Sequence, residues 1–146
     1  NSTAKILLDM NSPLSVVIHG ASGRNGRRLI TLASQDQRFK LAGAIVSSTS
    51  QYLGQDSGVM CGLAPTGVSV SSAWPERFDA CIDFSNAKAA VEAVETCRAK
   101  KIPIVVASTG LTKSDEAVLE KASKEIPVCY AANFSPAVNL TMKLAQ

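Results

Sequence analysis

Three glycines spaced three residues apart point most directly to chemistry in this chain. They lie in the segment Gly20-Ala-Ser-Gly23-Arg-Asn-Gly26, which follows a short β-branched run and opens a helical pattern. Such a turn brings backbone N–H groups and a helix N-terminus to a phosphate, as in dinucleotide-binding units. We expect Gly20 to permit a sharp exit from the strand, Gly23 to let a pyrophosphate approach, and Gly26 to let helix and strand pack closely. The spacing differs from the commoner G-x-G-x-x-G, so a tight turn that binds nothing stays an alternative.

The residues after the second predicted strand bear on which nucleotide would bind. NAD enzymes usually place an acid there, on the ribose hydroxyls. Residues 44–50 contain no acid, but they include Ser47, Ser48 and Thr49. These hydroxyls, with the guanidinium of Arg24, suit a 2′-phosphate, which favours NADPH over NADH. The alternative is that the serines only begin a solvated loop.

Short apolar runs alternate with helical patterns along the chain, which is typical of βαβ units. The runs are continuously apolar, as expected where helices cover both faces of a sheet. We therefore predict a Rossmann-like, doubly wound α/β fold with a mostly parallel sheet. A long loop is expected over 47–67, and Thr112 or Ser114 is expected to cap a helix. Strands are predicted at 15–19, 41–46, 68–70, 80–84, 103–107 and 128–131, and helices at 24–34, 87–99, 114–125 and 137–146.

The composition excludes several classes of protein. With 46% hydrophobic and 18% charged residues in a chain of 146, a disordered chain is excluded. No apolar run approaches the roughly 20 residues of a membrane helix, and a net charge of +3 is too small to indicate a nucleic-acid partner. One histidine and four cysteines without a C-x-x-C pair predict no metal site. We interpret Cys81 and Cys129 as buried, reduced thiols of a cytoplasmic protein.

Four blocks of sequence occur together: GASGRNGR at 20–27, LGQDSG at 53–58, DFS at 83–85 and AANFSPAVNL at 131–140. A fifth, ASTGL, lies at 107–111. In order and spacing they resemble the N-terminal domain of the 4-hydroxy-tetrahydrodipicolinate (dihydrodipicolinate) reductase family of lysine synthesis. The resemblance covers about residues 15–146.

The resemblance implies an oxidoreductase that uses NADH or NADPH to reduce a cyclic precursor to tetrahydrodipicolinate. It places the pyrophosphate on the glycine turn, the adenosine half beside residues 83–85, and the nicotinamide beside 107–109 and 131–134. The alternatives are that Asp83 only caps the following helix and that Asn133 only braces a turn. Together with the two serines above, the expected cofactor-binding residues are Gly20, Ala21, Ser22, Gly23, Arg24, Asn25, Ser47, Ser48, Phe84, Ala107, Ser108, Thr109, Ala131, Ala132, Asn133 and Phe134.

Two departures from the family pattern affect the cofactor site. Val46 and Ser47 stand where many members carry an acid, which leaves the ribose contacts and the cofactor preference open. Ala107 replaces a glycine and adds a methyl group beside the expected nicotinamide.

The family's substrate-binding and catalytic segment follows the last of these blocks, and this chain ends at Gln146. We expect residues 1–14 to be an N-terminal extension, with 1–9 of vector or upstream origin. Residues 15–146 are then a dinucleotide-binding domain, truncated at its C-terminal end, without the C-terminal substrate domain or catalytic residues. This fragment is expected to bind cofactor without turnover. The dicarboxylate substrate and a homotetrameric assembly would belong to the full-length enzyme, and no nucleic-acid or membrane partner is expected.

Two other interpretations remain open from the sequence. One is a different two-domain dehydrogenase of an amino-acid intermediate, resembling homoserine or aspartate dehydrogenase, although the AANFS residues at 131–135 argue against it. The other is a non-catalytic module that senses a nucleotide.

Overall fold

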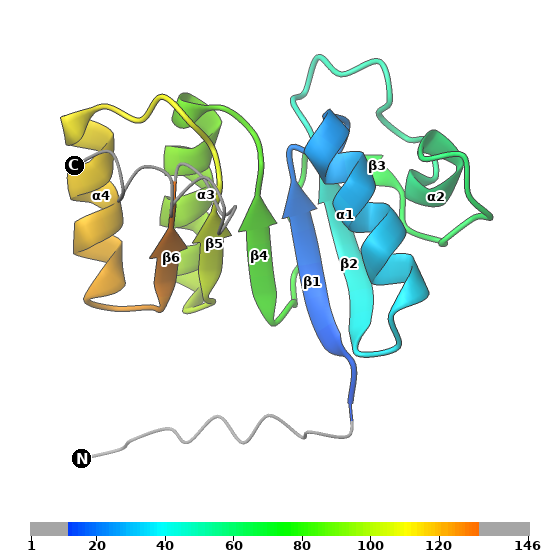
Figure 1. Cartoon of the computed structure of the whole chain (residues 1–146), viewed down its shortest axis with the longest axis horizontal. Helices are drawn as coiled ribbons and strands as arrows, with labels where there is room; N and C mark the ends of the chain where they lie inside the picture. The colour runs from blue at the N-terminus through cyan, green and yellow to red at the C-terminus, as the bar shows by residue number, and fades with distance from the viewer. Residues whose placement is uncertain (1–11, 132–146) are drawn as a thin grey trace, which may run out of the picture.

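A six-stranded parallel sheet forms the centre of the molecule. The computed structural model describes residues 12–131, so the helix predicted over 137–146 lies outside the described residues. The strand order is β3-β2-β1-β4-β5-β6, and every neighbouring pair is parallel (Figure 1). The order reverses between β1 and β4, which is where open α/β sheets bind ligands. The strands are β1 (Leu14–His19), β2 (Phe39–Ile45), β3 (Val70–Ser71), β4 (Ala80–Asp83), β5 (Ile104–Val106) and β6 (Val128–Tyr130).

Helices cover both faces of this sheet, as predicted. Alternation along β1 separates the two layers, because successive side chains of a strand point to opposite faces. Val16 and Ile18 pack in the cluster that includes Ile30 of α1, whereas Val17 packs with residues of α3 and α4. The doubly wound α/β fold is therefore confirmed. The helices are α1 (Arg24–Gln35), α2 (Ser57–Met60), α3 (Ala87–Lys100) and α4 (Lys113–Ser123).

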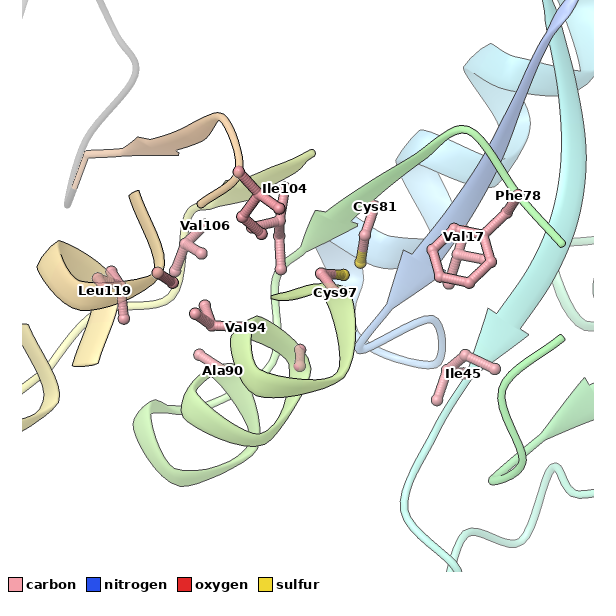
Figure 2. Close-up of a cluster of buried hydrophobic side chains, with 13 residues drawn as sticks. Val17, Ile45, Phe78, Cys81, Ala90, Val94, Cys97, Ile104, Val106 and Leu119 are labelled. Atoms are coloured by element: carbon pink, nitrogen blue, oxygen red, sulfur yellow. The ribbon is translucent and has the colours of Figure 1, made fainter. Parts of the chain in front are cut away.

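Small side chains let α3 lie close to the sheet. Its buried residues are Ala90, Ala93, Val94 and Cys97. They pack against strand residues and against α4 (Figure 2). A hydrogen bond from Cys97, together with burial, raises the pKa of the Cys81 thiol above its ordinary value. Such a thiol is poorly reactive.

The prediction of a buried thiol is confirmed for Cys81 and is wrong for Cys129. Cys129 is exposed, whereas its neighbours Val128 and Tyr130 pack against the core beside α3 and α4. The reason is alternation on the sheet's last strand, which turns Cys129 to the opposite face. An apolar run of three residues could not show which face would be covered.

The predicted loop over 47–67 contains a short helix, α2, which periodicity over four residues cannot reveal. Asp56 fixes it, because its carboxylate accepts hydrogen bonds from the backbone of Gly58, Val59, Thr66 and Gly67. These bonds lower the pKa of Asp56. The carboxylate of Asp56 thus ties the start of α2 to residues 66 and 67, and backbone bonds such as Ser57 N–H to the carbonyl oxygen of Val68 at 2.8 Å close the same loop.

Several element boundaries differ from the sequence prediction; β2, for example, is Phe39–Ile45 rather than 41–46. Leu14, assigned to the N-terminal extension, belongs to β1 and pairs with Phe39. The third strand is Val70–Ser71 rather than 68–70. Of the two candidate caps, Thr112 caps α4, in a capping box with Asp115.

No helix within residues 12–131 is long and apolar enough to cross a membrane.

Candidate functional site

The glycine turn joins β1 to α1 in a conformation that requires glycine. Gly20 has φ +76°, and a Cβ atom there would lie 2.5 Å from the carbonyl oxygen of Phe84. A Cβ atom on Gly26 would collide with the backbone of Gly20 and Ala21. The structure thus confirms the expected roles of Gly20 in the strand exit and of Gly26 in close helix packing.

The N-terminus of α1 opens outward from this turn. Gly23 occupies the N-cap and offers no side-chain acceptor to the first amides of the helix. Gly23, Arg24 and Asn25 are exposed. Free amides at the positive end of a helix dipole suit an anion, which is the arrangement predicted for a pyrophosphate.

Arg27 braces the turn from below, a role that sequence reasoning missed. Its guanidinium donates to the carbonyl oxygen of Ser22 at 3.0 Å and to that of Met60 at 3.0 Å. It also lies over the ring of Tyr52, 4.7 Å from the centroid. The sequence could have suggested this role, because Arg27 lies one helical turn after Gly23 and therefore on the same face of α1. Its partners, however, come from the loop that contains α2.

A cavity of about 800 Å³ lies beside the turn, at the carboxyl ends of β1, β2 and β4. Six of the predicted residues line it: Gly20, Ser22, Gly23, Ser47, Ser48 and Phe84. Ala21 is buried beneath the turn. Arg24 and Asn25 are exposed residues of the first turn of α1, outside the cavity lining.

A buried carboxylate lies at the reversal point of the sheet. Asp83, at the end of β4, is fully buried and accepts from Nδ1 of His19 at 2.6 Å, from Oγ of Ser85 at 2.5 Å and from Oγ of Ser108 at 2.5 Å. Asn86, not Asp83, caps α3 through the amide of Ala89. The alternative in which Asp83 only caps that helix is therefore wrong.

The residues predicted beside the nicotinamide form a second group, at the ends of β5 and β6. Ala107 and Ser108 are buried and Thr109 is exposed. The amide of Ala131 donates to the carbonyl oxygen of Val106 at 3.3 Å, which places Ala131 next to this group. The group does not line the cavity and is joined to it through Ser108 and Asp83. Ala132, Asn133 and Phe134 lie outside the described residues.

The charge around the cavity is mixed. Ser47 and Ser48 are exposed, and Oγ of Ser47 bonds to Oγ1 of Thr49 at 3.0 Å. No acid directly follows β2, but Glu92 and Lys88 of α3 also line the cavity. In the part of the chain that the structure describes, no three His, Cys, Asp or Glu side chains gather as a metal site.

Two aromatic residues in the cavity wall were missed by the sequence analysis. His19 ends β1, and its ring stacks on Trp74 with centroids 5.3 Å apart and an interplanar angle of 28°. Trp74 comes from the crossover between β3 and β4 and carries no motif. Only the crossover brings it over the end of β1.

Comparison with known proteins agrees with this architecture. Residues 14–134 match the family described as dihydrodipicolinate reductase, N-terminus. A 4-hydroxy-tetrahydrodipicolinate reductase of Rhodopirellula baltica is 44% identical over 145 residues, covering 96% of this chain and 52% of that protein. One from Acinetobacter baumannii is 36% identical over 140 residues, covering 94% of this chain and 51% of its own length. The chain thus spans about half the length of the curated relatives it matches.

A solved structure supports the fold alone. An amine dehydrogenase from Mycobacterium smegmatis superposes with a TM-score of 0.51 and 21% identity, over 77% of this chain and 38% of that one. The glycine turn, the parallel sheet and the family match agree with one another. The chain belongs to the family formed by the N-terminal domain of dihydrodipicolinate reductases.

Proposed function

We propose that this chain binds a nicotinamide dinucleotide, as the nucleotide-binding domain of a 4-hydroxy-tetrahydrodipicolinate reductase. One observation carries the proposal: the glycine turn and the amino end of α1 open beside a cavity of about 800 Å³ at the reversal point of the sheet. A pyrophosphate at the helix N-terminus would put one nucleoside in that cavity and the other over the ends of β5 and β6. The relatives are named as this reductase, and the chain aligns with about half of their length, which supports the same assignment.

The described residues suggest which part of the reaction the cofactor performs and which part the protein performs. The dinucleotide supplies a hydride when it is bound, and the protein supplies binding, orientation and electrostatics. Gly20, Gly23 and the first amides of α1 would hold the pyrophosphate. Ala107, Ser108 and Thr109 would support the nicotinamide. The substrate, a small dicarboxylate, and the residues that protonate it would belong to the longer enzyme, so the 146-residue chain binds cofactor without turnover.

NADPH is the proposed preference. The exposed hydroxyls of Ser47 and Ser48 follow β2 without an acid, so no like charge there opposes a 2′-phosphate. The side chain of Arg24 is exposed at the start of α1. A cytoplasmic location and a homotetrameric parent enzyme stay predictions.

Calorimetric titration of the chain with NADPH and with NADH tests the proposal. The expected result is saturable binding of both at one site, with NADPH the tighter ligand and no reductase activity. A Ser47→Ala, Ser48→Ala double variant should weaken NADPH binding and leave NADH binding unchanged. Binding of neither ligand would overturn the function, and equal affinities would overturn the preference alone. Reductase activity in the pure chain would overturn the absence of turnover.

A further inference from the structure

Arg27 joins two segments that are distant in the sequence. Its Nε donates to the carbonyl oxygen of Ser22 in the glycine turn, and its Nη1 donates to the carbonyl oxygen of Met60, both at 3.0 Å. Met60 is the last residue of α2, and the last carbonyl groups of a helix have no partner within it. One guanidinium thus ties the glycine turn to the end of α2.

The guanidinium of Arg27 carries its charge without an acidic partner. Within residues 12–131 it contacts two carbonyl oxygens and the ring of Tyr52, and it takes part in none of the ion pairs that form there. The side chain is half-buried, and arginine stays protonated in proteins. Hydrogen bonds from an ionised donor are stronger than neutral ones, so both carbonyl groups are firmly held.

The hydrogen bond to Ser22 fixes a peptide unit that the neighbouring glycines leave free to turn. Gly20 and Gly23 have no Cβ atom to restrict their backbone angles. The Ser22–Gly23 peptide is nevertheless held at both polar atoms, because the amide of Gly23 donates to the carbonyl oxygen of Gly20 at 3.1 Å while Arg27 holds the other side. The first amides of α1 follow this peptide directly, so its orientation sets the direction in which they point.

We propose that Arg27 is a positioning residue for the pyrophosphate of the dinucleotide. It aims the first amides of α1 through the carbonyl group of Ser22, and it makes the glycine turn and the end of α2 one mechanical unit. This inference rests on the proposed function, because it concerns the same ligand. Arg27 does not line the cavity and acts on the ligand through the turn. A ligand that steadies the turn should therefore also steady the end of α2.

Arg28 supplies a matched control, because it is the next residue of α1 and has the same charge. It is exposed and donates to neither carbonyl oxygen. Arg27→Gln should weaken NADH binding roughly tenfold by calorimetry, the scale of one hydrogen bond from a charged group. Arg28→Gln should change it by no more than about twofold. Circular dichroism shows that each variant is folded, and a merely structural role would leave the dissociation constant of a folded variant unchanged.

Arg27→Lys separates the charge from the geometry of the guanidinium. A lysine keeps the positive charge but lacks the planar fork that reaches both carbonyl oxygens at once. We expect Arg27→Lys to bind NADH more weakly than the unmodified chain. Full recovery of affinity would mean that charge alone acts, and would overturn the positioning role. Unchanged binding in folded Arg27→Gln, or an equal loss in Arg28→Gln, would overturn it as well.

Amide hydrogen exchange tests the link to α2 in the unmodified chain and needs no variant. The amides of Cys61 and Leu63 both donate to the carbonyl oxygen of Gly58 at 2.9 Å, and none of these residues lines the cavity. The amide of Glu125, which donates to Ala122 at 2.9 Å at the end of α4, is the control. NADH should slow exchange at Cys61 and Leu63 more than at Glu125. Equal slowing at the two helix ends would overturn the proposal.

The outcomes separate this inference from the function on which it rests. If NADH binds the unmodified chain but binds folded Arg27→Gln equally well, only the positioning role falls and dinucleotide binding still stands. If NADH does not bind the unmodified chain, both proposals fall.

Discussion

The carboxyl ends of β1, β2 and β4 differ sharply from those of β5 and β6. The first region is a cavity with a glycine turn, a helix N-terminus and an aromatic wall. The second is the end of two three-residue strands, where Thr109 and Gly110 are exposed. The first region is shaped by backbone geometry and buried contacts within residues 12–131. The second presents a surface on which one face of a ligand would lie.

Asp83 joins the two regions. Its carboxylate contacts His19 in the first region and Ser108 in the second, and its carbonyl oxygen accepts from the amide of Ala107 at 2.9 Å. A buried polar network of this kind is stabilising when every member is satisfied and costly when one is removed. Substitutions in and around it therefore test whether the two regions act as one site.

The largest effect is expected at the strand exit of the first region. Gly20→Ala forces a left-handed residue to carry a Cβ atom 2.5 Å from the carbonyl oxygen of Phe84. Strain and overpacking together predict a loss of about 3 kcal/mol or more in the free energy of unfolding, measured by urea denaturation.

Gly110→Ala, in the second region, is the matched control for Gly20→Ala. Gly110 has φ +80°, but a Cβ atom there would meet nothing within 4 Å. Left-handed strain alone predicts a loss of about 1–2 kcal/mol. Equal losses in the two variants would mean that close packing against Phe84 contributes nothing.

Asp83→Ala should come next, because it leaves three side-chain donors from both regions without their acceptor. The expected loss of unfolding free energy is about 2–4 kcal/mol, with weaker binding of NADPH by calorimetry. Asp79→Ala is the control: Asp79 accepts from the amide of Ser15 at the exposed, opposite end of β4, at 2.8 Å. A smaller loss for Asp83→Ala than for Asp79→Ala would contradict the linking role.

Two adjacent hydroxyls in the second region sharpen the comparison further. Ser108→Ala removes a buried donor to Asp83 and should cost about 1 kcal/mol, whereas Thr109→Ala, at an exposed position, should stay within about 0.5 kcal/mol. A double-mutant cycle with Asp83→Asn measures the coupling directly. Additive effects would show that Ser108 and Asp83 are energetically independent.

The smallest effect is expected on the pH dependence of stability, and the groups responsible lie outside both regions. Hydrogen bonds lower the pKa of Asp115 below its ordinary value of 3.8, and its side-chain bond to Arg38 lowers that of Asp36 to about 2. Depressed values mean that both groups stabilise the fold above about pH 4 and cease to do so as the pH falls toward 2. The melting temperature should drop over that window, and less so in an Asp115→Asn variant. A melting temperature that stays constant between pH 5 and pH 2 would contradict this.

The sequence predicted the parts of this molecule that depend on local pattern. Apolar runs and helical periodicity revealed the doubly wound sheet. The glycine spacing revealed the turn at Gly20–Gly26, because the positive φ of Gly20 and the close approach of Gly26 to Gly20 and Ala21 are local needs for glycine. Contacts between residues on different strands and crossovers could not be predicted from the sequence in this way. Trp74 meets His19 only through the crossover from β3 to β4, and the exposure of Cys129 depends on which face of an edge strand is covered. Asp56 closes its loop through partners up to eleven residues away.

Amide chemical-shift mapping of the isotope-labelled chain with NADPH tests most directly whether the two regions form one dinucleotide site. The account predicts saturating shifts with one dissociation constant at residues 20–25, at Ser47, Ser48 and Phe84, and at residues 107–109. Shifts confined to one region, different dissociation constants in the two, or none at saturating NADPH would contradict it.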